Sequence, residues 1–595
     1  MKKILYMMVL LMTTVVLVGC QEGLLADKKA PVISGLNDIT YTIGDPRPNL
    51  LASIQATDNV DEKENITISY DDSDVDYTTS GTYDIIYTAE DSKGNKATLT
   101  IKITVQTTSD DDGGQSSNFD LTIYYLNDTH GAIEKSEDQL GLANIGNLIL
   151  DEKAKNPETT LFIGGGDLLQ GNILSNYYYG SSMIDMFNVM QMDAFVLGNH
   201  EFDWGLDQVL RYRDVNSSQV QANYPILGAN ILLKDTMERP ALVDPYVIIE
   251  KGGLNIGIIG LIGQGLESSI ATARVAPYVF DDPVKWASYY AKELRTEQDV
   301  DIVLTVIHGN DYMTNQEVAS LNGDSKVDAI FNGHSHSRYT QTIQRDGVDI
   351  PVIQSKANGE YLGKVTLSIT QGIVSSFKAV NLHPYESSSN TSDRIEKDNR
   401  LLTEKSEIKL LIDEYKLVIS DLLNDSIITS GEYYSESSLT QFMAEIIRKS
   451  VDADLGIHNY GGTRTSLNKG QEITVATLYQ IFPFDNRVKY VYLKGEDIID
   501  YANSSVAINF RSGLSLSNLN YQTYYKVATN DYIFDKVDYP FIYGEDPIDT
   551  GILIRDLLEE VLRNQAKSYQ TFRIDQPVVI TPVVYQFELK EEENV

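Results

Sequence analysis

Short apolar runs recur along the middle of the chain, and a polar, glycine-containing stretch follows most of them. The runs read LTIYYL, TLFI, AFVL, LNIGIIGLI, DIVLTVI and VDAIF, and helical or loop segments separate them between residues 119 and 385. Continuous apolar runs of this length are typical of strands buried on both faces. The pattern predicts an α/β domain over 119–385 whose sheet lies between other layers.

Residues 31–106 show strand alternation instead. Apolar and polar positions alternate in DITYTI, NITISY, GTYDIIYTAED and KATLTIKITVQ, with DSKGN as a turn. Short strands at this spacing predict a small β-sandwich. The segment resembles the bacterial immunoglobulin-like (Ig-like) modules of surface proteins. That resemblance implies a spacer, with adhesion or contact with the cell envelope as the alternative role.

Polar segments separate the remaining parts of the chain. Residues 107–118, TTSDDDGGQSSN, have no apolar periodicity and are typical of a linker. The serine-rich stretch ESSSNTSD follows at 386–393, and after it RIEKDNRLLTEKSEIKLLIDEYKLVISDLLN has an amphipathic helical pattern. We therefore expect a multi-domain protein whose C-terminal domain, of α/β (α+β) class, covers 386–595.

The N-terminus has the layout of a secretory signal. Two lysines precede an apolar run too short for a comfortable membrane span, and the run ends in LVGC at Cys20. It resembles a bacterial lipoprotein signal over 1–19, followed by a tether over 20–30. The resemblance implies a lipid on Cys20 and a protein anchored outside the cytoplasmic membrane, at the bacterial surface. The alternative is an unlipidated signal with an incidental cysteine. Cys20 is the only cysteine, so the chain forms no internal disulfide.

Composition narrows the function classes. A chain of 595 residues with 42% hydrophobic and 22% charged residues is too long for one core and ordinary for a globular protein. The net charge of −37 argues against binding to a nucleic-acid polymer, which requires clustered Lys and Arg. An anionic small substrate would need metal ions or a few placed arginines to reverse the local field.

Polar clusters stand directly after five of the apolar runs. They are NDTHG at 127–131, GGGD at 164–167, GNHE at 198–201, HGN at 308–310 and NGHSH at 332–336. Five of the seven histidines lie in these clusters, and only His383 and His458 lie elsewhere. Open α/β sheets bind ligands at the carboxyl ends of their strands, and Asp, Asn and His side chains suit Zn²⁺, Mn²⁺ or similar ions. The sequence therefore predicts one divalent-metal site.

The ordered clusters resemble the binuclear metallophosphoesterase superfamily. NDTHG, GDLLQG and GNHEFDWG are similar to its 5′-nucleotidase/UDP-sugar hydrolase branch, and the resemblance covers about 119–590. It implies a four-layer α/β fold and two divalent ions (Zn, Mn or similar). It also implies the ligands: Asp128, His130 and His336 for one ion, Asn199, His308 and His334 for the other, and Asp167 as a bridge between them.

The same resemblance gives roles to the residues of GNHEFDWG. Two ions about 3.5–4 Å apart can hold a bridging hydroxide for in-line attack at phosphorus. Neighbours on an extended backbone point to opposite sides, so His200 is free to act on the phosphate while Asn199 ligates. Asp203 resembles the carboxylate of the family's catalytic dyad, which orients the imidazole. Glu201 is expected to be a structural hydrogen-bonding residue and Trp204 a packing residue.

In this family the C-terminal domain holds a nucleobase between two aromatic rings, an interaction that tolerates base identity. The resemblance implies these substrate-binding residues: Phe484 in IFPFDN, Tyr532 and Asp538 in ATNDYIFDKVD, and Asn459, Gly461 and Arg464 in HNYGGTR. The two rings could instead be core aromatics, and NYGGT a plain turn. The chain departs from the family pattern at Lys536 and Val537, which replace two glycines, and at Tyr433, which replaces an arginine.

The resulting hypothesis is an extracytoplasmic, metal-dependent hydrolase that converts nucleoside 5′-monophosphates to nucleoside and phosphate. One alternative keeps the site and changes the substrate to a UDP-sugar or a 2′,3′-cyclic nucleotide. A second alternative, of a different class, is a surface adhesin or binding protein without catalysis. The retention of every recognisable metal ligand argues against the adhesin.

Overall fold

The computed structural model describes residues 29–34, 39–43, 47–48, 50–51, 54–58, 65–106, 118–217, 220–502 and 505–583. The chain divides into two compact units, Met1–Gln115 and Ser116–Val595. The predicted signal, Cys20 and nearly all of the predicted linker lie outside the described residues. Of the helices that are described, none is both long and apolar enough to cross a membrane.

The first unit is a small β-domain. A four-stranded sheet has the order β2-β6-β5-β4 (Ile39–Thr42, Lys96–Gln106, Gly81–Glu90, Thr67–Asp71), and β1 (Val32–Ser34) pairs with β3 (Gln55–Thr57). Ile85, Tyr87 and Ala89 alternate along β5 and are fully buried, as strand periodicity requires. The alternating pattern thus predicted this domain correctly.

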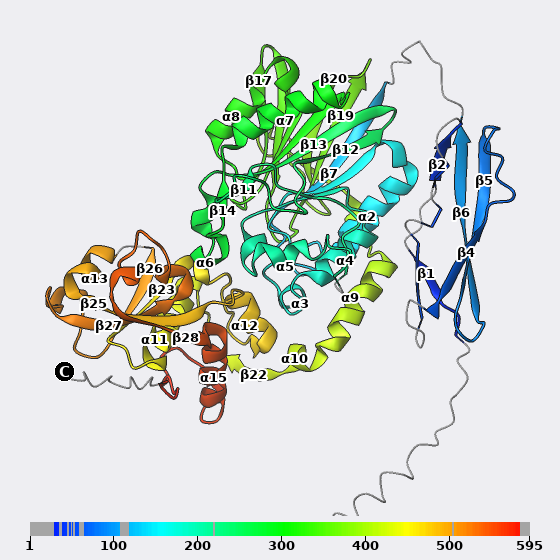
Figure 1. Cartoon of the computed structure of the whole chain (residues 1–595). Helices are drawn as coiled ribbons and strands as arrows, with labels where there is room; N and C mark the ends of the chain where they lie inside the picture. The colour runs from blue at the N-terminus through cyan, green and yellow to red at the C-terminus, as the bar shows by residue number, and fades with distance from the viewer. Residues whose placement is uncertain are drawn as a thin grey trace, which may run out of the picture. The chain divides into compact units, whose positions relative to one another are not determined.

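Two sheets form the centre of the second unit (Figure 1). The seven-stranded sheet has the order β10-β9-β8-β7-β19-β20-β21: Ile226–Leu227, Ala194–Val196, Thr160–Gly164, Phe119–Leu126, Leu362–Thr370, Ile373–His383 and Ile395–Lys397. The six-stranded sheet has the order β12-β13-β15-β16-β18-β17: Tyr246–Lys251, Leu254–Ile262, Ile302–His308, Ala329–Asn332, Val348–Ser355 and Arg338–Arg345. A separate pair consists of β11 (Ile231–Leu233) and β14 (Tyr278–Phe280).

Successive side chains on these strands face different layers. Ile123 of β7 packs against the other sheet with Val306 and Phe331, whereas its neighbour Tyr124 packs on the outer side with Phe162. Helices α2 (Leu142–Lys155) and α4 (Ser181–Val189) cover that outer side, and α7 (Pro283–Glu297) and α8 (Tyr312–Ala319) cover the second sheet. The result is the expected four-layer α/β arrangement.

The strands that precede the polar clusters run parallel. β7, β8 and β9 are parallel neighbours in one sheet, and β13, β15 and β16 are parallel neighbours in the other. Their carboxyl ends therefore meet at one edge of each sheet, where the short helices α3 (Ile173–Asn176), α5 (Leu206–Leu210) and α6 (Thr272–Val275) also lie.

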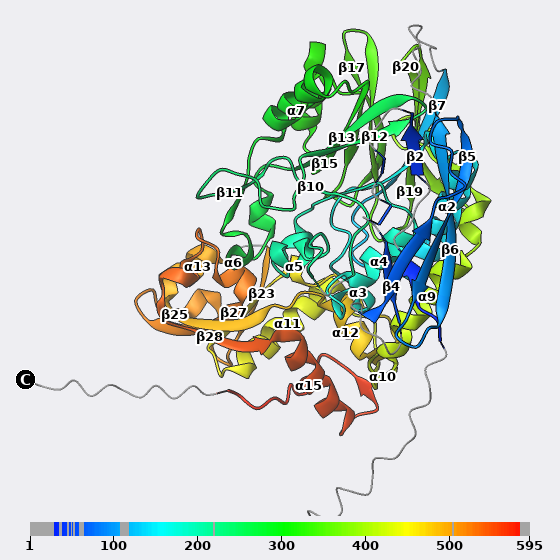
Figure 2. The ribbon, with the colours of Figure 1, turned by 45° about the vertical axis from the view of Figure 1, so that its right-hand side comes forward.

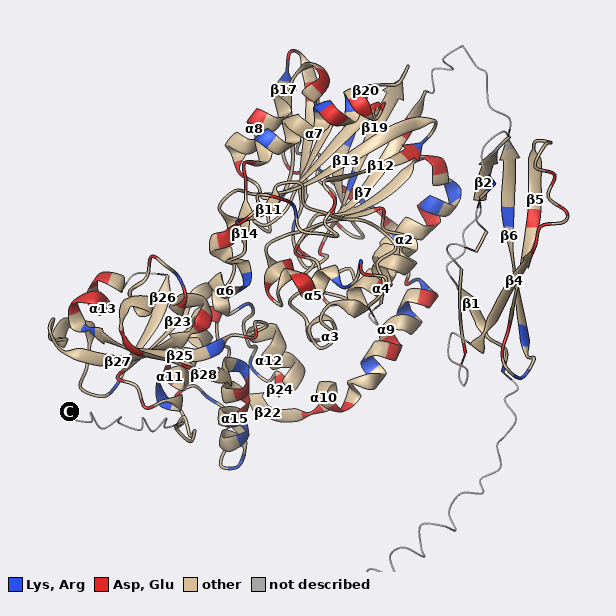
Figure 3. Ribbon diagram, viewed as in Figure 1, with Lys and Arg blue, Asp and Glu red and all other residues tan. Residues whose placement is uncertain are grey.

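The chain continues to pack on this domain beyond residue 385. Strand β21 pairs with β20, and α9 (Ser406–Val418) buries Ile408 and Ile412 in the same core as α2. Acidic and basic residues follow one another along α9, as the red and blue bands of Figure 3 show. Because residues 395–419 pack on the α/β domain, the packing favours a boundary after Ile419 over the predicted one at 385/386. The short helix α10 (Ser420–Asn424) follows.

The C-terminal part has its own sheet with helices on both faces (Figure 2). The five strands have the order β26-β23-β27-β25-β28: Val506–Phe510, Leu455–Asn459, Tyr524–Asn530, Arg487–Lys494 and Glu545–Leu553. A smaller sheet has the order β24-β22-β29: Glu472–Thr474, Ser426–Ser430 and Thr571–Phe572. The helices are α11 (Glu436–Ser450), α12 (Val475–Ile481), α13 (Gly495–Tyr501), α14 (Asp531–Phe534) and α15 (Ile554–Ala566). This architecture confirms the predicted mixed α/β class.

Candidate active site

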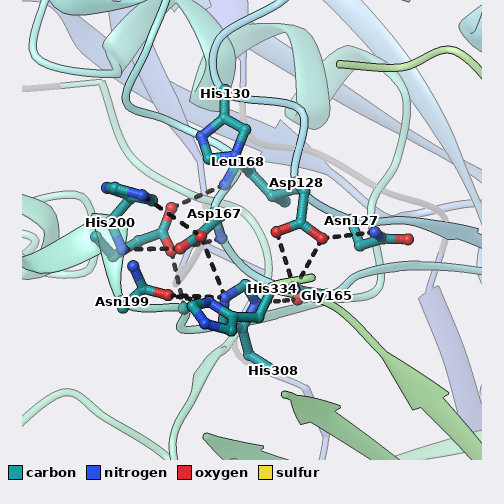
Figure 4. Close-up of polar contacts among 12 residues, drawn as sticks. Asn127, Asp128, His130, Gly165, Asp167, Leu168, Asn199, His200, His308 and His334 are labelled. Carbon is teal, nitrogen blue, oxygen red and sulfur yellow. Dashed lines mark hydrogen bonds and ion pairs between the residues drawn. The ribbon is translucent and has the colours of Figure 1, made fainter. Parts of the chain in front are cut away.

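The five polar clusters meet at the carboxyl ends of the parallel strands, around Asp167 (Figure 4). Their backbone is unusual: Asp128, His130, Asp167, His334 and His336 all have positive φ, between 48° and 74°. Residues with a side chain rarely adopt this conformation, and where they do it often marks a functional site. The strand ends are thus bent so that these side chains turn toward one point.

One group of potential ligands contains Asp128, His130 and His336. The Nε2 atoms of the two histidines lie 2.9 Å apart, and Asp128 Oδ1 lies 3.8 Å from His336 Nε2. Asp128 is fully buried and His130 is 8% exposed. Two imidazole nitrogens that converge on a carboxylate form a typical N/O donor set for a divalent ion.

A second group lies beside the first. Asn199 Oδ1 is 2.8 Å from His334 Nδ1 and 3.2 Å from His308 Nε2, and His308 Nε2 is also 3.2 Å from Asp167 Oδ2. Asp167 Oδ2 is buried and accepts no hydrogen bond from any residue that the structure describes. A buried carboxylate oxygen without a donor is costly unless a cation binds it. The donor set therefore fits a bound divalent ion.

Close packing of the loops explains the glycines. A Cβ on Gly198 would lie 2.4 Å from Asp167 Oδ1, and one on Gly166 would lie 2.5 Å from His308 Nδ1. Glu201 holds the same loops together, because its buried carboxylate accepts hydrogen bonds from the backbone N–H groups of Asp167, Leu168 and Gly198 at 2.8–2.9 Å. Glu201 thus has the structural role expected for it.

His200 lies between the metal-binding groups and open space. Its Nδ1 is 2.7 Å from Asp203 Oδ2, and its Nε2 lies 4.0 Å from Asp167 Oδ2. Burial works against a charged imidazole, but Asp203 and Asp167 outweigh it and raise the pKa of His200. Its ring stacks on Phe484 of the C-terminal domain, with centroids 5.5 Å apart. Trp204 packs against the core and meets Tyr179 edge to face, as expected of a packing residue.

The electrostatics of the cluster depend on burial and mutual contact. Burial raises the pKa of Asp128 to about 7. Burial opposes charge on His308 as well, yet the adjacent Asp167 carboxylate raises the pKa of this imidazole to about 10. Ligands must be deprotonated to bind a metal, so a divalent ion would displace the protons of Asp128 and His308.

A cavity of about 320 Å³ opens beside the cluster and reaches the C-terminal domain. At one end it is lined by Asp167, Asn199, His200, Asp203, His334 and His336, and elsewhere by Asn459, Gly461, Arg464, Phe484 and Tyr532, all of which were predicted. Arg464 lies over the Phe484 ring at 5.8 Å and forms no side-chain hydrogen bond or ion pair within the described part of the chain. An uncommitted guanidinium suits a phosphate or carboxylate ligand.

Several contacts close the cavity between the two domains. Tyr532 Oη donates to Ser268 O at 3.3 Å, and Lys536 Nζ donates to Ser268 O and to Ile270 O. On the other side, Gln170 Nε2 donates to Pro483 O at 3.0 Å. Lys536, which replaces a family glycine, thus lies in the contact between the domains and adds to it.

Two predicted features lie apart from the cavity. The Asp538 side chain is exposed and does not line the cavity, whereas Asp535 and Asp531 do. The reason is local: α14 ends at Phe534, so Asp535 caps the helix beside Lys489, and Asp538 follows in the next turn. Tyr433 is 59% exposed, and it too is absent from the lining. Sequence reasoning did not place Asp531, Asp535 or Arg274 at the cavity. The two aspartates lie within ATNDYIFDKVD, where the resemblance pointed to Tyr532 and Asp538 instead, and Arg274 lies in a segment without a recognisable motif.

Comparison with protein families agrees with this arrangement. A family described as calcineurin-like phosphoesterase matches residues 121–338, and one described as 5′-nucleotidase, C-terminal domain, matches residues 419–516. A third, bacterial surface protein, Ig-like domain, matches residues 32–105. The fold and site therefore define a phosphoester hydrolase of the metallophosphoesterase class.

Individual proteins similar to this chain include nucleotide hydrolases by name. The chain is 25% identical to an apyrase of Tabanus yao over 456 residues, which cover 67% of this chain and 76% of the relative. It is 25% identical to a 5′-nucleotidase of Vibrio parahaemolyticus over 427 residues, which cover 65% of this chain and 74% of the relative. The crystal structure of a 5′-nucleotidase precursor from Thermus thermophilus has the same fold, with a TM-score of 0.62 and 19% identity over 78% of this chain and 99% of the other. The chain thus carries an N-terminal Ig-like domain, a calcineurin-like phosphoesterase domain and a 5′-nucleotidase C-terminal domain, and it is similar to 5′-nucleotidases.

Proposed function

We propose that the protein hydrolyses nucleoside 5′-monophosphates to nucleoside and phosphate outside the cytoplasmic membrane. The observation that supports this most directly is the single cavity that joins the Asp/His cluster to Phe484, Tyr532 and Arg464. A 5′-nucleotide has a phosphate at one end and a planar base at the other, and the cavity provides complementary groups at both ends.

The chain's own residues then have distinct tasks. Asp128, His130 and His336 would hold one divalent ion, and Asn199, His308 and His334 a second, with Asp167 shared. When bound, such ions would polarise the phosphate and supply a nucleophilic hydroxide. Arg464 is placed to pair with phosphate oxygens. His200, oriented by Asp203 at 2.7 Å, would stabilise the developing charge and donate a proton to the departing 5′-oxygen.

The test is a panel of phosphate esters assayed with Mn²⁺ and with Zn²⁺. We expect phosphate release from AMP and other 5′-monophosphates, and a loss of about 1000-fold or more in Asp167→Asn, because both sites share this buried carboxylate. Measured metal content should fall in the same variant. Turnover of a UDP-sugar or a 2′,3′-cyclic nucleotide alone would contradict the substrate, and no turnover of any ester with metal supplied would contradict the enzyme.

We further propose that a lipid on Cys20 anchors the protein and that the Ig-like domain acts as a spacer. The LVGC sequence that ends at Cys20 supports the anchor, and the match to a bacterial surface Ig-like domain supports an extracytoplasmic location. Cys20→Ser should move the protein from the membrane fraction to the soluble fraction of the expressing cells. Retention of the variant in the membrane fraction would contradict the lipid anchor.

A further inference from the structure

A buried amide lies behind the cavity wall and connects two of its parts. Asn530 is the last residue of β27 and is fully buried. Strand β23, which ends at Asn459, runs parallel beside β27. The two asparagines therefore reach the same edge of the sheet, and only Asn459 lines the cavity.

Every polar atom of the Asn530 side chain is engaged. The Nδ2 group donates to His458 Nδ1 and to Asn459 Oδ1, both at 2.8 Å, and Oδ1 accepts from Ile533 N at 2.8 Å. This last bond caps α14, which carries Tyr532. A primary amide has two N–H bonds, so both donors are used.

These contacts admit one orientation of the Asn530 amide. If it were turned over, its oxygen would face Asn459 Oδ1 and its NH₂ group would face the N–H of Ile533, which replaces two attractive contacts by repulsive ones. His458 Nδ1 must be an acceptor, so its proton is on Nε2. The neutral form agrees with burial, which lowers the pKa of His458 to about 3.

The orientation of Asn530 determines the orientation of Asn459. Because Asn459 Oδ1 is held by Asn530, its NH₂ group is the end left for a ligand, and it has no other hydrogen-bond acceptor among the described residues. We propose that Asn530 is a positioning residue for base recognition: it turns the NH₂ group of Asn459 into the cavity and fixes the helix that carries Tyr532. A ring that presents acceptor atoms at its edge would be preferred. This inference rests on the proposed nucleotide substrate.

The informative variant is Asn530→Asp. A carboxylate has the same shape and can still cap α14 by accepting from Ile533 N, but it cannot donate to Asn459 or His458. Asn459 would then be free to present its carbonyl group to the ligand. We expect the KM for AMP to rise about 10-fold, the cost of roughly one hydrogen bond, with kcat nearly unchanged.

Ribose 5-phosphate provides the control within the same sample. It has the sugar and phosphate of AMP but no base, so its kcat/KM should be the same in wild type and Asn530→Asp. The matched variant Asn509→Ala removes an asparagine of neighbouring β26 that bonds Arg448 at 2.7 Å away from the cavity, and it should leave both substrates unaffected. Asn530→Ala, which also removes the cap, should raise the KM for AMP further.

The possible results distinguish a failure of the role proposed for Asn530 from a failure of the proposed nucleotidase function. An unchanged KM for AMP in Asn530→Asp, or an equal loss with ribose 5-phosphate, would show that Asn530 has no role in base recognition. A wild type that hydrolyses neither AMP nor other nucleotides would overturn the proposed function, and this inference with it. A wild type active on AMP with a selective rise in KM supports both.

Discussion

The two ends of the cavity are built in different ways. At the metal-binding end, Asp128, Asp167, Asn199 and His308 are at most 1% exposed, and they come from four segments that pack against one another. At the other end, charged side chains reach water: the Arg487 side chain is 47% exposed. Metal ligation and phosphate chemistry permit few residue types and little movement, whereas a cavity wall can be made from many side chains. Substitutions at the metal-binding end should therefore abolish catalysis, whereas substitutions at the end formed by the C-terminal domain should alter substrate selectivity.

The largest effects on catalysis and metal content are expected from substitutions of two neighbours at the metal-binding end, His200 and Asn199. His200→Ala should retain both metal ions and lower kcat by about 100- to 10,000-fold, since it removes a proton donor from the reaction. Asn199→Ala should weaken one metal site, because its Oδ1 lies within 3.2 Å of two ligand histidines. Metal content by mass spectrometry, together with kcat at saturating metal, distinguishes the two. Loss of metal from His200→Ala would contradict its non-ligating role.

The next largest effect concerns stability and a histidine outside the metal site. The site histidines lie within 4.8 Å of carboxylate oxygens, whereas the polar side chain that contacts His458, among the described residues, is the Asn530 amide. Its pKa is lowered to about 3 from 6.5 by burial. Between these pH values the unfolded chain binds a proton that the folded chain does not, so the free energy of unfolding falls as the pH falls, by up to several kcal/mol.

His458→Gln removes this titration, so the free energy of unfolding should fall less between pH 6.5 and pH 4 in the variant than in the wild type. The measurement is denaturant unfolding of the C-terminal domain within the full chain. His383→Gln is the control, because the His383 side chain is 17% exposed and lies near Glu386. In His383→Gln the free energy of unfolding should still fall with pH almost as steeply as in the wild type. An unchanged slope in His458→Gln would contradict the assignment of a neutral, buried imidazole.

A smaller effect is expected at the base end of the cavity. Tyr532→Ala removes a ring and should raise the KM for AMP by about 10-fold or more, since stacking contributes roughly 1–3 kcal/mol. Tyr532→Phe keeps the ring and loses only the hydrogen bond to Ser268 O, so its KM should change by less than about threefold. If both variants behave alike, the hydroxyl contact between the domains matters more than the ring.

The difference between the two ends of the cavity also explains which features could be predicted from the sequence. All seven predicted ligands meet at one site, because divalent metals accept few residue types and the clusters follow strands whose ends coincide. The domain boundary at 385/386 stays a prediction. The pairing of β21 with β20 beyond it could not be foreseen, since β21 is a three-residue strand whose pattern carries no signal. Asn530 was not anticipated either. Its contacts depend on the adjacency of β23 and β27, which no local motif encodes.

The smallest expected effect decides between two aspartates three residues apart. The family resemblance assigns ribose binding to Asp538, but the geometry places Asp535 on the cavity wall, where Lys489 holds it at 2.8 Å. Asp538→Asn should therefore change kcat/KM for AMP by less than about twofold, as is usual for an exposed residue. Asp535→Asn should reduce it several-fold, with a similar reduction for ribose 5-phosphate, because the contact would be to the sugar. The opposite ranking would mean that the loop from Lys536 to Asp538 rearranges when substrate binds, and that the second end of the cavity is formed only in the complex.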